Sequence, residues 1–363
     1  YVPTFDKDAG SKTTYQYLKM FVKMGYSVKF LGDNFLHEEP YSTTLQQMGV
    51  EILYGPGYQA GIWDWLTKNK DEIDFAYLNR PHIAIKYIDF IKKNTNIKVI
   101  YYGHDLHFLR EYREYELTGD IQKKRESDYW KSIEFSLMEK AAVSYYPSYV
   151  EEEAIHAIHP EYKIRAITAY VYEKFLENID KDFEKREGLL FVGGFAHPPN
   201  ADAVLWFAKE IFPLIRQKLD VNFYVVGSKV TDEIKALEQP GSGIIVKGFV
   251  TEEELASLYA TSRIVVVPLR YGAGVKGKVV EAVYNGSAIV TTPIGSEGIP
   301  EAERVMKVAD GPEAFADEVV KMYQDPAECR RMCEETQKYI REYFSVEAAW
   351  KVIEGDFTPE KKR

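Results

Sequence analysis

The sequence predicts an α/β protein that folds into two Rossmann-like, doubly wound domains facing each other across a cleft. Three observations favour this class. Short runs of β-branched and aromatic residues alternate with helical patterns, which is typical of βαβ units and parallel sheets. A charged stretch without a strand pattern, residues 173–188, interrupts the alternation, which then starts again. The 363 residues are also enough for two domains of ordinary size.

The first half of the chain begins at the end of a strand. The letters "YVP" have a strand pattern, and the next segment, "GSKTTYQYLKMFVKMG", is already helical. Most of the first strand is therefore missing, so we expect further residues, with room for further domains, upstream of Tyr1. The later strands of this half are expected at residues 26–32, 74–78, 98–103, 142–147 and 164–171.

The second half repeats the alternation after the charged stretch. "LLFVGG" (189–194) predicts its first strand, and a helix is expected to begin near Asn200. The predicted domains are residues 1–172 and 189–345, with residues 173–188 as the linker. Ligands of such sheets bind outside the carboxyl ends of the strands. Further strands are expected at residues 222–227, 244–250, 263–269, 287–293 and 304–310.

Composition and charge exclude some classes of function. A net charge of −10 argues against nucleic acid as a partner, because contact with phosphates favours a basic surface. One local basic cluster, Lys123, Lys124 and Arg125, is either a solvated helix face or a contact for an anionic membrane or acceptor. No apolar run approaches the roughly 18 residues that span a bilayer.

The cysteines and histidines indicate neither disulfides nor metal binding. Cys329 and Cys333 lie four residues apart in a helical pattern, a spacing that suits a disulfide poorly. Reduced thiols and a cytoplasmic location are therefore the default, and a peripheral position on the inner membrane face is compatible with it. The seven histidines are scattered without the spacing of metal ligands, so no metal site is expected.

The stretch "RYGAGVKGKVVEA" (270–282) matches G-x-G-x-x-G from Gly272 to Gly277. It follows a predicted strand and opens a predicted helix, as a dinucleotide fingerprint does. Three details argue against a dinucleotide. At least three strands of the domain precede the motif, two lysines lie at its end, and the next strand ends in Thr292 and Pro293 rather than in an acidic residue.

A diphosphate that leaves during a reaction fits this loop better. Backbone N–H groups and the positive end of a helix would face it, and Lys276 and Lys278 add full charges. Arg270, at the end of the strand, can fork onto a phosphate or a carboxylate. Glu281, on the helix, could accept hydrogen bonds from a ribose diol. The plain alternative is that both lysines are ordinary solvated side chains.

Longer segments carry a resemblance to a known family. "LLFVGGFAHPPNADAVLWFAKEIFPLI" and "SRIVVVPLRYGAGVKGKVVEAVYNGSAIVTTPIGSEGI" resemble GT-B glycosyltransferases of the large retaining group called group 1 or family four, in a branch with a GxGxKxK pattern. In the first half, "DKDAGSKTTYQYLKMF" resembles the glycine-containing first loop of this family, and "DLHFLREYRE" its active-site region. The resemblance implies that the second domain holds a nucleotide sugar and the first domain the acceptor.

The resemblance also assigns donor-binding residues. Glu281 matches the second glutamate of the family's E-x7-E motif, which contacts the ribose. The position of the first glutamate holds Ala273, which leaves the donor sugar open. His197 and Asn200 stand near the place of a basic pair that family members often carry. The other matched residues are Gly10 and Ser11 in the first domain, and Gly194, Phe195, Gly274 and Val275 in the second.

Polar residues at the ends of first-domain strands are further candidates. Asp105 and His107 follow "KVIYYG" and are expected at its carboxyl end, in the cleft. Asp105 either takes part in catalysis or caps the next helix. His107 either contacts the donor sugar or the acceptor, or is a buried histidine with a backbone partner. Glu297 is expected in the cleft wall near the donor sugar. The acceptor-side candidates are Arg80, His104 and Arg110.

The resemblance implies transfer of a hexosyl group, with retention, from a UDP-, GDP- or dTDP-linked sugar to a glycan or lipid-linked acceptor, in the synthesis of surface polysaccharide or glycoconjugates. No metal or other cofactor is expected, because lysines, an arginine and a helix dipole supply positive charge. Residues 346–363 resemble the segment that, in this fold, returns to the first domain. Two alternatives stay open: a non-catalytic scaffold that binds nucleotide sugars, which Ala273 favours, and a sugar-nucleotide epimerase.

Overall fold

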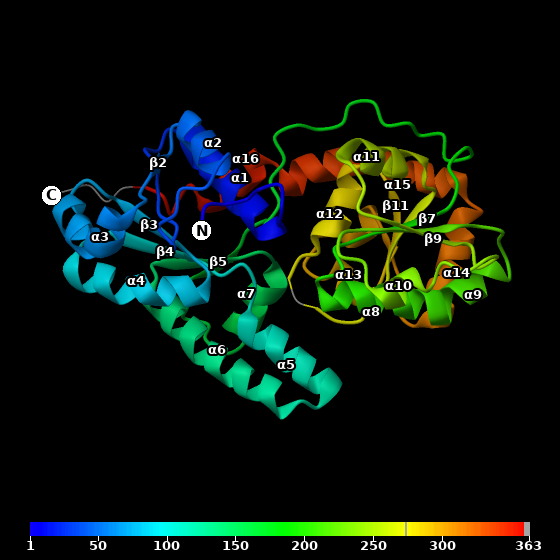
Figure 1. Cartoon of the computed structure of the whole chain (residues 1–363), viewed down its shortest axis with the longest axis horizontal. Coiled ribbons are helices and arrows are strands. Elements are labelled where there is room, and N and C mark those ends of the chain that lie inside the picture. Colours follow the sequence, from blue (N-terminus) through cyan, green and yellow to red (C-terminus); the bar gives the residue numbers. More distant parts are fainter. Residues whose placement is uncertain (273, 359–363) are drawn as a thin grey trace. The chain divides into compact units, whose positions relative to one another are not determined.

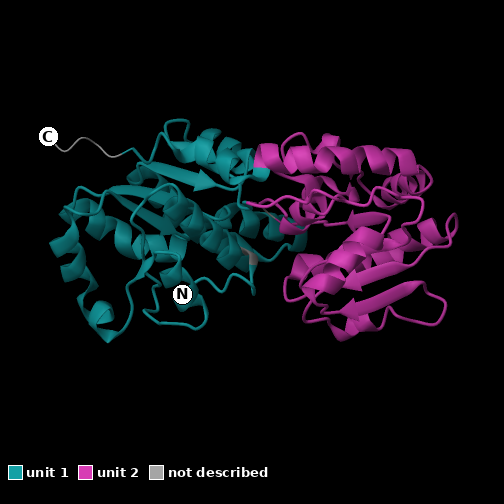
Figure 2. Ribbon diagram, turned by 90° about the horizontal axis from the view of Figure 1, so that it is seen from above, with its two compact units in different colours: residues 1–171, 344–363 teal, residues 172–343 magenta. Residues whose placement is uncertain are grey.

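The computed structural model of the chain describes residues 1–272 and 274–358 (Figure 1). They form two compact units (Figure 2). Unit 1 contains residues 1–171 and the described residues from Phe344 on, and unit 2 contains residues 172–343. Ala273, which bears on the donor sugar and on the scaffold alternative, lies outside the described residues.

Unit 1 contains two parallel sheets. The four-stranded sheet has the order β3-β4-β5-β6, so its neighbouring strands follow one another in sequence. The other sheet has only two strands, β1 and β2, in which Lys29 pairs with Glu51 and Phe30 with Ile52. The bounds are β1 Lys29–Phe30, β2 Glu51–Ile52, β3 Phe75–Asn79, β4 Lys98–Tyr102, β5 Val143–Tyr146 and β6 Ile164–Ala166.

Helices cover both faces of the four-stranded sheet. The helices of unit 1, of which α2 packs with β2 and α1 instead, are α1 Ala9–Lys23, α2 Tyr41–Gln47, α3 Pro56–Asn69, α4 Pro81–Asn94, α5 His107–Thr118, α6 Ile121–Lys140, α7 Tyr149–His156 and α16 Val346–Ile353. In β4, Val99 and Tyr101 belong to a core with α4 and α6, whereas Ile100 and Tyr102 belong to a core with α1 and α16. Successive side chains of a strand point to opposite faces, so burial of all four explains why this strand is apolar throughout.

The helices α5 and α6 form a hairpin (Figure 1). α5 ends at Gly119, whose φ of +73° is in the left-handed region that favours glycine. At its other end, the carboxylate of Glu134 in α6 accepts hydrogen bonds from the backbone N–H groups of His107 (2.9 Å) and Phe108 (3.1 Å). The interpretation of Asp105 as the cap is therefore wrong, because a carboxylate from the neighbouring helix takes that place.

Unit 2 contains one parallel sheet of six strands in the order β12-β11-β10-β7-β8-β9. Every residue of β10 and β11 is buried, as expected for central strands of a parallel sheet. The strands are β7 Leu189–Val192, β8 Phe223–Val226, β9 Ile244–Gly248, β10 Ile264–Val267, β11 Ala288–Thr291 and β12 Lys307–Val308. The helices are α8 Pro198–Trp206, η1 Phe207–Ile211, α9 Phe212–Arg216, α10 Asp232–Lys235, α11 Glu252–Thr261, α12 Gly277–Tyr284, α13 Pro293–Ser296, η2 Ala302–Arg304, α14 Pro312–Tyr323 and α15 Pro326–Phe344.

Residues 173–188, expected to be a linker, contain no helix or strand and pack on unit 2. The backbone N–H of Leu176 donates to Oε1 of Gln337 (3.0 Å). The guanidinium of Arg341 lies 4.2 Å from the ring centre of Phe175. Both partners come from α15, so this helix fixes the start of the segment.

Candidate functional site

The strand order of unit 2 reverses at β7. β8 and β9 lie on one side of this strand, and β10, β11 and β12 lie on the other. At such a reversal the connections after the two neighbouring strands diverge, which leaves a crevice at their carboxyl ends where doubly wound sheets bind ligands. The connections here are residues 193–197, after β7, and residues 268–276, after β10. The glycine-rich motif is part of the second connection.

A chain of hydrogen bonds joins the connection after β7 to the first turn of α12. Nζ of Lys278, in the first turn of α12, donates to Oδ1 of Asn200 (2.7 Å), and Nδ2 of Asn200 donates to the carbonyl oxygen of Gly194 (2.7 Å). The neighbouring Gly193 leaves little room for a side chain, since a Cβ there would lie 3.0 Å from Nδ2 of Asn200 and 3.1 Å from Cε of Lys278. The amide of Asn200 thus holds both the β7 loop and the lysine in place.

Lys278 is a half-buried cation. Burial and, to a smaller extent, the charge of Lys276 lower the pKa of Lys278 to about 8, whereas Glu281 acts in the opposite direction. The loss of hydration penalises the charged form of a lysine. An anion bound beside this ammonium group would replace the lost hydration, so the site is suited to a negatively charged ligand.

Lys276 lies directly before α12, and only 8% of its surface is exposed. Its Nζ contacts the carbonyl oxygen of Gly274 and lies 3.5 Å from Oε2 of Glu297. Gly274 has a φ of +72°, a left-handed conformation that glycine adopts without strain. Lys276 and Lys278 therefore stand together at the amino end of one helix, where the helix dipole adds positive charge.

The other residues predicted around this motif differ in how deeply they are buried. Glu281 lies about one turn beyond Lys278 on α12 and is half-buried, as is Val275, whereas Phe195 is buried. Glu297, the predicted wall residue, is here the partner of Lys276.

Arg270 is held by α8. Its Nε donates to Oδ2 of Asp202 (2.9 Å), its Nη2 contacts the other oxygen of that carboxylate, and its guanidinium lies 5.6 Å from the ring centre of Trp206. A guanidinium that forks onto a carboxylate has fewer donors left for phosphate. The structure thus groups Lys276, Lys278 and Glu281 at the start of α12 and assigns Arg270 to a neighbouring ion pair.

In unit 1, Gly10 and Ser11 lie at the start of α1. Asp8 caps this helix: its carboxylate accepts from the backbone N–H of Ser11 (2.8 Å) and from its Oγ (2.7 Å). A Cβ on Gly10 would lie 2.2 Å from Nη2 of Arg80. The glycine thus lets the guanidinium of Arg80 approach the first turn of α1.

Two adjacent strands of unit 1 end in strained residues. Arg80, after β3, has a φ of +65°, and His104, after β4, has a φ of +66°. Residues other than glycine rarely adopt this conformation, and such strain is concentrated at functional sites. Nε2 of His104 lies 3.2 Å from Oδ1 of Asn79, the last residue of β3. Burial, followed by the charge of Arg80, holds the pKa of His104 well below its ordinary value.

His107 lies in a buried polar network of the α5–α6 hairpin and is 7% exposed. Its Nδ1 lies 3.2 Å from both the backbone oxygen and Oδ1 of Asp105, and 3.5 Å from Oε1 of Glu134. Burial opposes its protonation, but the hydrogen bond to Glu134 and the charge of Asp105 raise the pKa of His107 above its ordinary value. Arg110 pairs with Asp105 and, through Nη2, with Glu111 (3.0 Å). The network holds these side chains against one another.

Four residues of these networks are not among the site residues predicted from the sequence. They are Asp8, Asn79, Glu134 and Asp202. Asp8 alone has a local signal, since an aspartate three residues before a serine at the start of a helical pattern is typical of an N-cap. The other three act on partners from other elements, which only the fold brings close.

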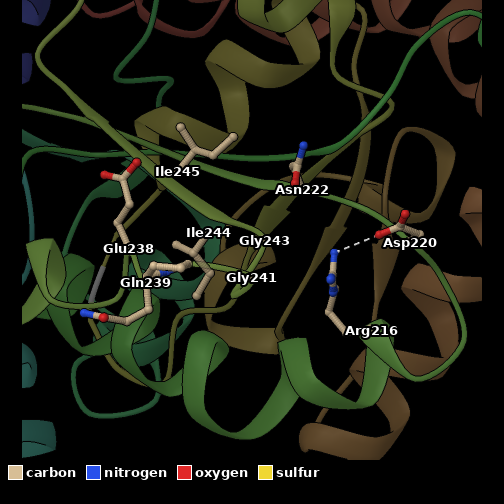
Figure 3. A pocket seen from close by; sticks show the side chains of 10 residues that line it. Arg216, Asp220, Asn222, Glu238, Gln239, Gly241, Gly243, Ile244 and Ile245 are labelled. Atoms are coloured by element: carbon tan, nitrogen blue, oxygen red, sulfur yellow. Dashed lines mark hydrogen bonds and ion pairs between the residues drawn. The ribbon is translucent and has the colours of Figure 1, made fainter.

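A separate hollow on unit 2 lies at the opposite edge of the sheet (Figure 3). Its lining includes Asn222, which precedes β8, and Ile244, which begins β9, so it is at the amino ends of these strands. At its rim, Nη1 of Arg216 donates to Oδ1 of Asp220 (3.0 Å). The candidate loops leave the carboxyl ends of the sheet, so this hollow is not part of the candidate site.

Within residues 1–272 and 274–358, no three side chains of His, Cys, Asp or Glu are arranged to hold a metal ion. No helix in those ranges combines the length and the apolar character needed to cross a membrane.

Comparison with known proteins assigns a family to part of the chain. Residues 186–325, which include both connections of the candidate site and α12, match the family described as "Glycosyl transferases group 1". A protein of Klebsiella pneumoniae, described as an uncharacterized 44.6 kDa protein in the cps region, is 31% identical over 116 residues. That match spans 30% of this chain and only 30% of the Klebsiella protein.

Solved structures share the fold over much of the chain. Sucrose-phosphate synthase from Thermosynechococcus elongatus has a TM-score of 0.69 at 15% identity, covering 96% of this chain and 92% of that one. Anabaena HepE in complex with UDP has a TM-score of 0.66 at 12% identity, with 95% of each chain covered. S. aureus TarM, in a complex that contains UDP, has a TM-score of 0.60 at 14% identity, covering 81% of this chain and 57% of that one. The chain therefore has the α/β fold seen in GT-B glycosyltransferases, and residues 186–325 of unit 2 are similar to group 1 glycosyl transferases.

Proposed function

We propose that the protein is a retaining, metal-independent glycosyltransferase that moves a hexosyl group from a nucleotide sugar to a hydroxyl of a glycan or lipid-linked acceptor. The observation that supports this best is the pair of ammonium groups, Lys276 and Lys278, at the amino end of α12 and beside the reversal point of the sheet. The Klebsiella relative in a cps region supports a role in surface polysaccharide or glycoconjugate synthesis.

The proposed chemistry depends on charge that develops on a leaving group. The acceptor oxygen forms a bond to the anomeric carbon while the bond from that carbon to the diphosphate oxygen breaks. The proton of the acceptor hydroxyl passes to a diphosphate oxygen on the same face, so no protein base is needed. Negative charge on the diphosphate increases in the transition state, where Lys276, Lys278 and the N–H groups at the start of α12 stabilise it.

The donor is held by unit 2 in this proposal. Glu281 accepts hydrogen bonds from the ribose diol, and the β7 loop around Gly194 and Phe195 contacts the donor from the other side of the crevice. The carrier is UDP, GDP or dTDP. HepE and TarM were solved with UDP, which supports testing uridine-linked sugars first.

We further propose that unit 1 binds the acceptor and that the protein acts in the cytoplasm, with a peripheral position on the inner membrane face. Arg80 and His104 are the acceptor-side residues, supported by their strained backbone. The basic cluster of α6 gives less support to membrane contact than its sequence suggests. Nζ of Lys123 lies 2.8 Å from Glu111, and two further carboxylates within 3.3 Å also neutralise it.

A panel of UDP-, GDP- and dTDP-linked sugars tests the proposal. A rise in melting temperature identifies the donor, release of free nucleotide in the presence of acceptor glycans measures transfer, and NMR of the product gives the anomeric configuration. Retention is the expected result. Stoichiometric donor binding without transfer to any acceptor and without hydrolysis would favour the scaffold, and conversion of the donor sugar without transfer would favour the epimerase.

A further inference from the structure

The ammonium group of Lys276 is held by acceptors of the protein itself. Its Nζ contacts the carbonyl oxygen of Gly274 and lies 3.5 Å from Oε2 of Glu297. The side chains of the ion pair are only 8% and 12% exposed, so water screens the pair poorly. Nζ of Lys278 has a neutral partner instead, the amide of Asn200 (2.7 Å). The two lysines of the candidate site are therefore held by different kinds of group, a carboxylate for Lys276 and an amide for Lys278.

The glycine-rich loop is folded around the side chain of Lys276. Gly272 has a φ of +135° and Gly274 a φ of +72°, and glycine adopts both conformations without strain. A Cβ on Gly272 would lie 3.5 Å from Cε of Lys276, so the lysine stem runs back along the loop beside this glycine. The ammonium group and its carboxylate partner therefore lie at the loop for which the sequence predicts a diphosphate.

The backbone that carries Glu297 is fixed at the end of the neighbouring strand. β10 and β11 pair in parallel, so the turns that follow them leave the same edge of the sheet side by side. Oγ1 of Thr292 donates to the carbonyl oxygen of Leu269 (2.5 Å) and accepts from the backbone N–H of Gly295 (3.2 Å). A Cβ on Gly295 would lie 1.9 Å from Oγ1 of Thr291, so the turn is tightly packed. A change of partner by Glu297 therefore needs a rotation of its side chain only.

A diphosphate in this loop competes with Glu297 for the same cation. It carries more negative charge than a carboxylate and offers more acceptor oxygens, so it displaces Glu297 from Lys276. The displaced carboxylate then lies beside another anion in a poorly hydrated place, which is unfavourable unless it gains hydrogen-bond donors. The sugar of a nucleotide sugar is bonded to the diphosphate, so its hydroxyl groups are donors at that end of the ligand. A nucleoside diphosphate brings none there.

We propose that Glu297 exchanges partners during the reaction and so favours the intact donor over the nucleoside diphosphate product. With the donor bound, the carboxylate leaves Lys276 and accepts a hydrogen bond from a hydroxyl of the sugar. After transfer the sugar is gone, and the carboxylate returns to Lys276, where it competes with the diphosphate and promotes its release. The inference rests on the proposed function, because it takes a nucleotide sugar as the ligand of unit 2. Glu297 is thus a specificity-determining residue that discriminates substrate from product.

The affinity of Glu297→Gln for nucleoside diphosphates tests this proposal. Calorimetry on the parent and the variant, with UDP, GDP, dTDP and inorganic pyrophosphate as probes, measures how tightly each product-like anion binds. The variant should bind the matching nucleoside diphosphate and pyrophosphate about tenfold more tightly, because no carboxylate competes for Lys276. The affinity for the matching nucleotide sugar should not rise, since the weakened contact with the sugar hydroxyl offsets the gain. Product inhibition of transfer should become stronger in proportion.

Two further variants show whether the gain comes from Lys276. Glu303→Gln, at an exposed position of the same unit, removes the same charge and should leave every affinity unchanged. In a Lys276→Ala background, Glu297→Gln should give no gain, since the cation for which the two anions compete is absent. An equal gain with and without Lys276 would indicate general repulsion by a negative charge and would overturn the exchange.

The outcomes separate this inference from the proposed function. If the parent binds a nucleoside diphosphate and Glu297→Gln binds it equally well or more weakly, the exchange is overturned and the proposed function stands. If neither protein binds a nucleoside diphosphate or pyrophosphate, both are overturned, because the loop then holds no diphosphate. Glu297→Ala repeats the comparison with a different side chain and should show the same gain.

Discussion

The pKa of Lys278 gives the candidate site a defined pH dependence. With a pKa of about 8, this lysine loses its charge as the pH rises through that value. We expect kcat/KM, which reports on the free enzyme, to fall above pH 8 because the diphosphate then loses a cationic partner. In kcat the fall should move to higher pH, since the bound diphosphate stabilises the ammonium group. Rate profiles between pH 6 and 10 measure both.

The variant Lys278→Arg is the control for this assignment. A guanidinium stays charged throughout the range, so the fall in kcat/KM should disappear even if the rate at pH 7 is lower. A fall that persists unchanged near pH 8 would assign it to a different group. The sign for stability is opposite: because the pKa of Lys278 is below its ordinary value, the unfolded chain binds more protons between pH 8 and 10.5, and this group makes the free energy of unfolding rise with pH there.

Gly10 can be tested through its contact with Arg80. In Gly10→Ala the new methyl group would lie 2.2 Å from Nη2 of Arg80, so that side chain must move. The free energy of unfolding should change by less than about 1 kcal/mol, because alanine favours a helix and the displaced group is the end of a flexible side chain. Transfer should fall about tenfold if Arg80 positions the acceptor.

A double-mutant cycle separates this explanation from a general effect on α1. In an Arg80→Ala background, Gly10→Ala should cause little further loss of transfer, since the group that it displaces is gone. Equal losses in both backgrounds would show that Gly10 acts independently of Arg80.

At the scale of elements, the α5–α6 hairpin depends on Glu134. This carboxylate is fully buried and accepts from two backbone N–H groups at the start of α5. Glu134→Ala leaves both donors without a partner and should lower the free energy of unfolding by about 3 kcal/mol. Glu139→Ala, an exposed position of the same helix, should change it by less than about 0.5 kcal/mol. Denaturant titration of both variants measures the difference, and equal effects would contradict the assigned cap.

Strand positions could be predicted well from the sequence because buried parallel strands are continuous apolar runs. All six expected strands of the second half contain a strand of unit 2, from β7 to β12. In the first half β2 was missed, since two residues carry no periodicity. The order of the strands in the sheet could not be predicted from the sequence, because neighbours such as β7 and β10 are separated along the chain by two other strands, β8 and β9, and by the helices around them.

The candidate site shows the same division between local and long-range information. The position of Lys276 and Lys278 at the carboxyl edge of the sheet could be predicted, because their loop follows a buried strand and opens a helix. The partners of other predicted residues could not be found in this way. Arg270 pairs with Asp202, 68 residues earlier, and His107 is held by Glu134, 27 residues later. Such pairs depend on tertiary packing, which a local motif does not encode.

At the scale of the whole molecule, charge neutralisation by side chains predicts independence from metals. Transfer by the full chain should proceed at its full rate in excess chelator, because lysines and a helix terminus take the role that Mg²⁺ or Mn²⁺ plays elsewhere. Loss of activity in chelator, with recovery on addition of either ion, would contradict this part of the proposal.

The most direct test of the central claim is donor turnover by Lys276→Ala and Lys278→Ala, with Lys321→Ala, an exposed lysine of α14, as the matched control. If the two ammonium groups stabilise the leaving diphosphate, each loss should cost roughly 2.7–4 kcal/mol, which is about a hundred- to a thousandfold in kcat. Nucleotide affinity should weaken much less, because part of the contact forms only in the transition state. The control should keep the parent rate. Parent rates in both site variants with a confirmed donor would show that this loop is a structural turn and would contradict the account.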